Sequence, residues 1–279
     1  MSQQIVVGVD GSPAAAAAVE WAADDATRRG RDLRIVHVCE QWSQNQGTEH
    51  CEGALEAAAD IARGLATGVK VTTELLTGNV VERLIAESAT ADGIVLGSRG
   101  LGGFTGMLLG SVSSAVAGHA AGPVVVVRAP QRAQHGRVVA GYDGSEHAQA
   151  AMQYAVEQAR SRHARLHVVT AWQVPSLSPY GVAYAQLIEQ IMEEQPRRAR
   201  ELVEPWRTAN PDLVMTDEQP CDHPATALIR AAETADLVVV GSRGRGGFAS
   251  ALLGSISHAV LHHATCPVAV VRPPAEKDA

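Results

Sequence analysis

The chain has 279 residues, 46% of them hydrophobic, and this length allows one large domain or two domains of about 140 residues. Its formal net charge of −7 argues against a nucleic-acid-binding protein, which normally carries a basic stripe. No apolar run reaches the ~18 residues that a membrane span needs. The N-terminal residues MSQQIVVGVDGS predict a first strand rather than a signal peptide, so we expect a cytoplasmic protein.

Strands and helices are predicted to alternate through the first half. Apolar runs predict five strands, over residues 4–9, 33–38, 70–76, 93–98 and 123–128. Helical patterns predict four intervening helices, over residues 13–29, 50–66, 79–89 and 111–119. Ser12 and Pro13 are typical of the N-cap and first residue of a helix, which supports the first of them.

The second half repeats the first. Residues 97–128 recur at 241–272 with 21 of 32 positions identical, and the DGS at Asp10 recurs at Asp143. The offset grows from 133 to 144, so eleven extra residues are expected in the second half, within 172–190. The five repeated strands are predicted over residues 137–142, 164–171, 213–219, 237–242 and 267–272. We therefore expect two domains, 1–129 and 136–273, joined by the polar segment APQRAQHG at 129–136.

The predicted strands are continuous runs of Val, Ile and Leu rather than alternating patterns. Such runs are typical of parallel strands that are buried on both faces. Strands joined by helices in this way predict a doubly wound α/β sheet with right-handed crossovers. Ligands bind such sheets at the carboxyl ends of the strands, near the point where the strand order reverses.

A glycine-rich segment follows the fourth strand of each half, GSRGLGGFTGMLLGS from Gly97 and GSRGRGGFASALLGS from Gly241. Glycines let backbone N–H groups approach an anion, and the helix that follows adds its N-terminal amides and dipole. Asp10 and Asp143 end the first strands, where a carboxylate suits ribose hydroxyls or Mg²⁺. On this interpretation Gly97→Ala or Gly110→Ala places a methyl group where the phosphate approaches.

Two common nucleotide-binding motifs are excluded. The Walker A loop needs a lysine after its glycines, and neither Lys70 nor Lys277 lies there. The dinucleotide fingerprint belongs to the first strand–helix turn, which here reads DGSP. The loops therefore predict neither a P-loop NTPase nor a nicotinamide-dependent dehydrogenase.

The chain resembles tandem universal stress proteins, whose ATP-binding signature is Gly-x2-Gly-x9-Gly followed by Ser or Thr. The signature is present twice, as Gly97, Gly100, Gly110-Ser111 and as Gly241, Gly244, Gly254-Ser255. The resemblance implies two tandem Rossmann-like domains, each a five-stranded parallel sheet of order 3-2-1-4-5 with helices on both faces. It also implies that the fifth strands, PVVVVR and PVAVVR, pair the domains in a homodimer or an intramolecular pseudo-dimer.

The resemblance also implies roles for individual residues. Asp10 and Asp143 would contact ribose or Mg²⁺, Val38 and Ala171 would lie beside adenine, and the loops would hold the phosphates. The nucleotide-binding residues expected in the first half are Gly8, Asp10, Val38, Gly97, Ser98, Arg99, Gly100, Gly102, Gly103, Gly110, Ser111, Val112 and Ser113. Those expected in the second half are Gly141, Asp143, Ala171, Gly241, Ser242, Arg243, Gly244, Gly246, Gly247, Gly254, Ser255, Ile256 and Ser257.

One position departs from the family pattern, and the cysteines add a separate expectation. Family members often carry glycine after the third strand, as at Gly78, whereas the second half has Asp222. A carboxylate at that rim is expected to weaken nucleotide binding or to alter the need for metal. The four cysteines form no CxxC pair and predict a reduced protein with incidental thiols; they are Cys39, Cys51, Cys221 and Cys266.

The leading hypothesis for function is an ATP-binding regulator that senses the nucleotide in a stress response and acts through an unknown protein partner. The alternative is a slow Mg²⁺-dependent ATPase, although the loops offer no clear general base and no lysine. A third interpretation is a dimerisation module with vestigial sites, which the retention of the motif in both halves disfavours.

Overall fold

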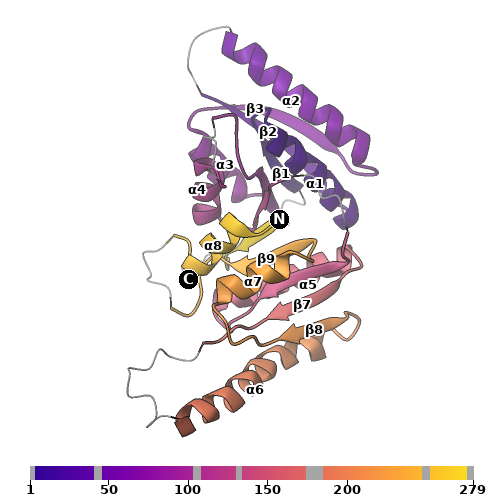
Figure 1. Cartoon of the computed structure of the whole chain (residues 1–279). Helices are drawn as coiled ribbons and strands as arrows, with labels where there is room; N and C mark the ends of the chain where they lie inside the picture. Colours follow the sequence, from indigo (N-terminus) through magenta and orange to yellow (C-terminus); the bar gives the residue numbers. More distant parts are fainter. Residues whose placement is uncertain are drawn as a thin grey trace, which may run out of the picture.

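The computed structural model describes residues 4–40, 46–102, 108–129, 134–173, 185–246 and 252–274. Strands and helices alternate along both halves of the chain (Figure 1). The strands are β1 (Gln4–Val9), β2 (Asp32–Cys39), β3 (Val71–Thr77), β4 (Gly93–Gly97), β5 (Val124–Val127), β6 (Arg137–Gly141), β7 (Arg165–Val169), β8 (Met215–Glu218), β9 (Leu237–Gly241) and β10 (Val268–Val271). The helices are α1 (Pro13–Arg29), α2 (Gln46–Leu65), α3 (Val80–Ser88), α4 (Ser111–His119), α5 (Glu146–Ser161), α6 (Ala185–Ala209), α7 (Pro224–Ala232) and α8 (Ser255–His263).

All ten strands form one sheet in the order β3-β2-β1-β4-β5-β10-β9-β6-β7-β8. Within each half the strands are parallel, and the halves meet where β5 pairs antiparallel with β10, with Val125 opposite Ala269. The predicted α/β class and doubly wound sheet are confirmed. Each fifth strand has its apolar edge covered by the other, so this pairing takes place within one chain.

Two apolar layers cover the two faces of the sheet and run through both halves. Residues of α1, α2, α5 and α6 belong to one layer, and residues of α3, α4, α7 and α8 belong to the other. On β1, Ile5 and Val7 enter the first layer and Val6 enters the second, and none is more than 1% exposed. Burial of each such side chain stabilises the fold by about 1.5–3 kcal/mol, which explains why the strands are continuous apolar runs.

The local signals at the start of α1 act as the sequence predicts. The Ser12 hydroxyl accepts a hydrogen bond from the Ala15 N–H at 3.1 Å, and Pro13 is the first helical residue. Gly30 ends the helix in the left-handed conformation, with φ of 60°. Ser145 caps α5 in the same way. These caps fix where each helix leaves the carboxyl end of its strand.

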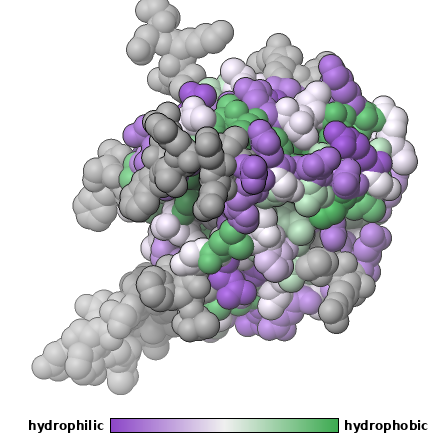
Figure 2. All heavy atoms as spheres, turned by 90° about the horizontal axis from the view of Figure 1, so that it is seen from above, coloured by the Kyte–Doolittle hydropathy of each residue, from purple (hydrophilic) through white to green (hydrophobic). Residues whose placement is uncertain are grey.

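The two halves differ most after their second strands. Of the segment where extra residues were expected, 172–190, residues 172–173 follow β7 and residues 185–190 are the start of α6. Residues 174–184 lie outside the described residues. Within the parts of the chain that the structure describes, no helix is both long and apolar enough to cross a membrane. On the face in Figure 2, hydrophilic side chains are spread among the hydrophobic ones.

The expectation of four incidental reduced thiols is wrong for one pair. Cys39 at the end of β2 and Cys51 in α2 form a disulfide, with their Cα atoms 6.2 Å apart. Because α2 packs on β2, two residues that are 12 apart in the sequence come into bonding range without a CxxC motif. Cys221 and Cys266 are free, and burial raises the pKa of the Cys266 thiol to about 12.

Candidate functional site

Each half has a cavity at the carboxyl ends of its central strands. The first cavity, of about 590 Å³, lies between the ends of β1, β2 and β4, and the second, of about 320 Å³, lies at the matching ends of β6, β7 and β9. β1 and β4 are neighbours, as are β6 and β9, so these are the points where the strand order reverses. The cavities are thus where the doubly wound sheet was expected to bind a ligand.

An aspartate ties the glycine loop to the first strand in both halves. Asp10 accepts hydrogen bonds from the Ser12 N–H and the Leu101 N–H, both at 3.0 Å. Asp143 accepts the matching pair from the Ser145 N–H and the Arg245 N–H, also at 3.0 Å. Each carboxylate therefore bridges two backbone segments, a structural role that the sequence does not reveal.

The glycines of each loop allow two different close contacts, one with the aspartate side chain and one with the backbone of α1 or α5. A Cβ atom on Gly244 would lie 2.7 Å from an Asp143 oxygen, and one on Gly100 would clash in the same way with Asp10. A Cβ atom on Gly97 would lie 2.6 Å from the Ala14 carbonyl carbon in α1. Gly97 is therefore required where the helix packs on the strand end. The interpretation that Gly97→Ala would block a phosphate is wrong, because the methyl group points at α1.

The helices behind the loops begin without side-chain caps. Gly110 and Gly254 occupy the N-cap positions of α4 and α8, and no side chain there accepts a hydrogen bond from the first helical amides. The first residues, Ser111 and Ser255, are exposed and line the cavities. Uncapped N–H groups and the positive end of the helix dipole make each helix start a ready site for an anion.

Two predicted serines in each half are poorly placed to donate to a ligand. Ser113 donates its hydroxyl hydrogen to the Gly97 carbonyl at 2.6 Å, and Ser257 donates to Gly241 at 2.5 Å. Each hydroxyl has one hydrogen, so neither serine can donate to a phosphate while that bond is made. Ser98 and Ser242 are 1% and 0% exposed and line neither cavity.

The structure brings most of the predicted residues together around the two cavities. Those that line the first are Gly8, Asp10, Val38, Gly97, Arg99, Gly100, Gly102, Gly110, Ser111, Val112 and Ser113. Those that line the second are Gly141, Asp143, Ala171, Gly241, Arg243, Gly244, Gly246, Gly254, Ser255, Ile256 and Ser257. Gly103 and Gly247 lie outside the described residues. Asp222, expected at the rim of the second cavity, is not among its lining residues and pairs with Arg230 at 3.3 Å.

Comparison with known proteins identifies the family. The model of the Universal stress protein family matches residues 1–128 and 135–272. The chain belongs to this family. A universal stress protein of Mycobacterium tuberculosis is 36% identical over 305 residues, which cover 97% of this chain and 95% of the relative. A relative in Mycolicibacterium smegmatis is 35% identical, covering 96% and 97%. The crystal structure of a universal stress protein from Archaeoglobus fulgidus has a TM-score of 0.72 at 22% identity, covering 98% of this chain and 99% of that one.

The two cavities of this universal stress protein are not equivalent, and one difference is His147, which contacts a lining residue of the second cavity, Arg243. The Nε2 atom of His147 accepts a hydrogen bond from Arg243 at 3.1 Å, so the hydrogen of the neutral ring lies on Nδ1, which is 3.0 Å from the Ser242 hydroxyl. Burial lowers the pKa of His147, and the positive charges of Arg243 and Arg272 act in the same direction. The first half has Ala14 at the corresponding position, so its loop arginine has no such partner from α1.

The first cavity has its own set of ionisable residues, which the sequence analysis missed. His37, Glu40 and His50 line it, from the end of β2 and from α2. Burial lowers the pKa of His37, and His50 acts in the same direction, whereas Asp10 opposes the shift. His37 lies at the end of a strand that was already expected beside the ligand, and this position was the available signal. His50 could not be placed, because it depends on how α2 packs.

Proposed function

We propose that this universal stress protein binds one ATP molecule in each half and acts as a nucleotide-dependent regulator in a stress response. One observation carries the proposal. In both halves a helix that begins without a side-chain cap and a glycine loop that is hydrogen-bonded to an aspartate line the same cavity. Cavities of about 300–1,000 Å³ are typical of small-molecule sites, and both volumes fall in that range. We also propose that the domains span residues 1–129 and 136–273.

The lining of each cavity suits the parts of a nucleotide. The amides at the starts of α4 and α8, with the loop glycines, would hold phosphates, and Ser111 and Ser255 would donate to them. Asp10 and Asp143 line the cavities and would accept from ribose hydroxyls, since a carboxylate oxygen can accept more than one hydrogen bond. Val38 and Ala171 supply apolar contact for the base at the ends of the second strands.

Mg²⁺ fits these sites as an ion that the nucleotide brings. Mg²⁺ keeps an octahedral oxygen shell and is usually held by one or two carboxylates together with substrate phosphates. Each loop offers one aspartate, both of whose oxygens already accept backbone N–H groups. Among the described residues, no cluster of three acidic or other ligating side chains lies at either loop. When bound, the ion would neutralise phosphate charge, and Asp10 or Asp143 would add at most one ligand.

The alternative function, a slow Mg²⁺-dependent ATPase, has less support. No lysine lines either cavity within the described parts of the chain. The first cavity has Glu40, His37 and His50, which could accept a proton from water. Among the described residues that line the second cavity, there is no glutamate or histidine, and Asp143 is the one carboxylate. Turnover confined to the first half would therefore favour the enzymatic alternative.

The decisive experiment measures nucleotide stoichiometry. Denaturation of the purified protein should release ATP, and calorimetric titration of the emptied protein should give two ATP per chain. Ser111→Asp should abolish binding at the first site, because a carboxylate at the start of α4 repels phosphate while remaining favourable for the helix dipole. Ser255→Asp is the matched change in the second half, and the double variant should bind none.

Two outcomes would contradict the proposal. Absence of measurable ATP affinity in the emptied wild-type protein would exclude a nucleotide sensor. Sustained release of ADP from ATP and Mg²⁺, lost in one single variant only, would assign the protein to the ATPase class. Circular dichroism of each variant shows whether α4 and α8 still form.

A further inference from the structure

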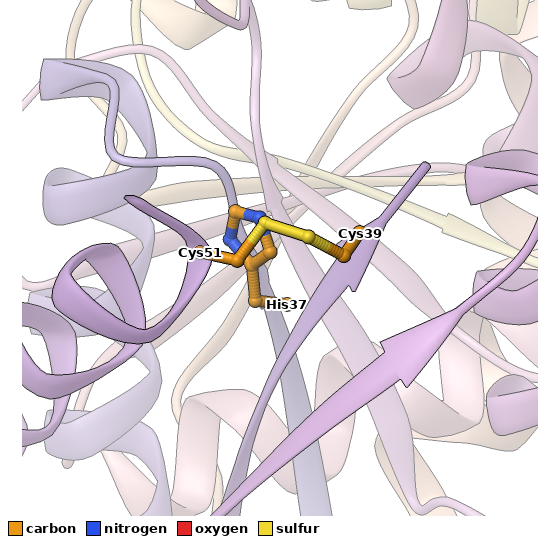
Figure 3. A group of neighbouring side chains, drawn as sticks. All are labelled: His37, Cys39 and Cys51. Carbon is orange, nitrogen blue, oxygen red and sulfur yellow. A yellow bond between two sulfur atoms is a disulfide. The ribbon is translucent and has the colours of Figure 1, made fainter. Parts of the chain in front are cut away.

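Three potential metal ligands lie close together between β2 and α2 in the first half, as Figure 3 shows. His37 and Cys39 are two residues apart on β2, so they project from the same face of the strand. α2 packs on that face and brings Cys51 to them. One ring nitrogen of His37 and the two sulfur atoms all lie within 4.8 Å of one another.

The imidazole in this cluster has an unsatisfied polar atom. His37 is 6% exposed, and its buried Nδ1 atom has no hydrogen-bond partner. Buried polar atoms in proteins are nearly always paired, because leaving one unpaired costs its full desolvation energy. Cys51 is also buried, at 7% exposure. A buried imidazole beside two sulfur atoms is a donor set that a soft or borderline metal ion would satisfy.

We propose that reduction of the Cys39–Cys51 disulfide converts this cluster into a Zn²⁺ site ligated by Cys39, Cys51 and His37. Zn²⁺ is bound in proteins by cysteine sulfur at about 2.3 Å and histidine nitrogen at about 2.0–2.1 Å, in tetrahedral geometry. Two thiolates and an imidazole form a donor set that selects Zn²⁺ over the hard ions Mg²⁺ and Ca²⁺. The proposed zinc ligands are not among the residues proposed to contact ATP at the glycine loop.

The conversion balances with a small dithiol as the reductant. The dithiol supplies two electrons and two hydrogens, the S–S bond between Cys39 and Cys51 breaks, and the reductant leaves as a cyclic disulfide. Zn²⁺ then displaces one proton from each thiol, and both protons go to solvent. His37 contributes the lone pair of a ring nitrogen and is not oxidised or reduced.

The backbone is already placed for both states. Tetrahedral Zn–S bonds of about 2.3 Å require the two sulfur atoms to lie roughly 3.8 Å apart. Rotation of the released Cys39 and Cys51 side chains can supply this separation, because their Cα atoms are 6.2 Å apart. The fourth position of the ion would be taken by water. Since His37 also lines the first cavity, the metal site adjoins the proposed nucleotide site.

The second half has no counterpart of this cluster. The positions that correspond to His37 and Cys39 are occupied by Thr170 and Trp172. Within the described residues, this is also the one group of three potential ligands close enough to hold a metal. The proposal therefore predicts one Zn²⁺ per chain rather than two.

The test uses the full chain with the other two thiols removed, as Cys221→Ser with Cys266→Ala. This protein is reduced with dithiothreitol, and the reductant is then removed under anaerobic conditions. The reduced protein is titrated with Co²⁺, whose absorption spectrum reports thiolate ligands. We expect a sulfur-to-cobalt charge-transfer band that saturates at one ion per chain and disappears when Zn²⁺ is added. The oxidised protein should give no such band.

His37→Gln in the same background separates a metal site from a simple thiol pair. Loss of a residue that only hydrogen-bonds to a metal ligand typically lowers metal affinity 10–100-fold. Loss of a ligand itself should lower Co²⁺ affinity by more than this, and it should change the spectrum. Formation of the disulfide in the oxidised variant shows that β2 and α2 still meet. The proposal is overturned if the reduced background protein binds no Co²⁺, or if His37→Gln leaves the affinity and spectrum unchanged.

Discussion

Single residues decide how strongly each helix start could bind the proposed phosphate, and Gly110 shows how. It is the N-cap of α4 with φ of −77° and ψ of 154°, a conformation open to any residue, so the glycine is not required by the backbone. A Cβ atom there would meet its nearest neighbour, the Ser98 carbonyl oxygen, at an ordinary 3.4 Å. Its absence of a side chain leaves the helix amides free for a ligand.

We expect Gly110→Ser to change stability and binding in opposite directions. A serine hydroxyl would accept from the second or third helical amide, which stabilises the helix by a few tenths of a kcal/mol relative to glycine. The same hydrogen bond competes with phosphate, so ATP affinity at the first site should fall several-fold. Urea unfolding and calorimetric titration measure the two effects. A parallel loss of stability and affinity would show that Gly110 has a packing role instead.

His147 makes the stability of the second half depend on pH. In the unfolded chain His147 takes up a proton near its ordinary pKa of about 6.5. In the folded chain its pKa is lowered, so it takes up the proton only at lower pH. The free energy of unfolding should therefore fall as pH drops through 6.5. His147→Ala, which copies Ala14 of the first half, should reduce this pH dependence. Thermal melts between pH 5 and 8 measure it, and equal slopes for both proteins would exclude His147 as a source.

At the scale of elements, the contact between α1 and the end of β4 requires glycine. Because a Cβ atom on Gly97 would lie 2.6 Å from α1 backbone, Gly97→Ala must push the helix from the strand. Overpacking of this kind costs about 1–3 kcal/mol. Gly102→Ala is the matched control, since its Cβ atom would meet nothing within 4 Å. Urea unfolding should separate the two variants, and equal midpoints would mean that α1 shifts without cost.

Much of this architecture could be predicted from the sequence, because the strongest signals are local. The apolar runs, the Ser12-Pro13 helix start and the repeated glycine spacing each depend on a few neighbouring residues. The roles that were missed depend on packing between distant segments. The Asp10 bond to Leu101 spans 91 residues, and the contact of His147 with Ser242 spans 95. No spacing rule in a single sequence reports such pairs, and the Cys39–Cys51 bond was missed for the same reason.

At the scale of the whole molecule, the halves share a sheet and a buried ion pair. Arg162, at the end of α5, lies 3.3 Å from Asp25 in α1, and the Asp25 side chain is 1% exposed. The Arg162 guanidinium also lies over the Trp21 ring, 4.8 Å from its centre. Asp25 also pairs with Arg29 of its own helix at 3.4 Å, so the contact between the halves belongs to a small network of buried charges. The join is therefore part of the folded core, and a change in one half can reach the other through it.

Each glycine loop is connected with the opposite half by one arginine. Arg128, just after β5, donates to the Leu108 carbonyl near its own loop at 2.8 Å and to the Leu261 carbonyl in the last turn of α8. Arg272, just after β10, makes the matching contacts with Leu252 and Gly118. A cation at a helix C-terminus stabilises the helix, and α8 and α4 are the helices whose starts face the cavities. Each loop is thereby linked to the helix whose start lines the cavity of the other half.

We expect this link to couple the two proposed ATP sites. A nucleotide bound at the first loop would hold Arg128 against α8 and so favour binding in the second half, and coupling between sites is typically 5–150-fold. Blocking the first site with Ser111→Asp should therefore weaken the second site at least about fivefold. In a protein that also carries Arg128→Met and Arg272→Met, the same block should leave the second site unchanged. Calorimetric titration measures both affinities, and an unaltered second site in the protein with intact arginines would show that the halves bind independently.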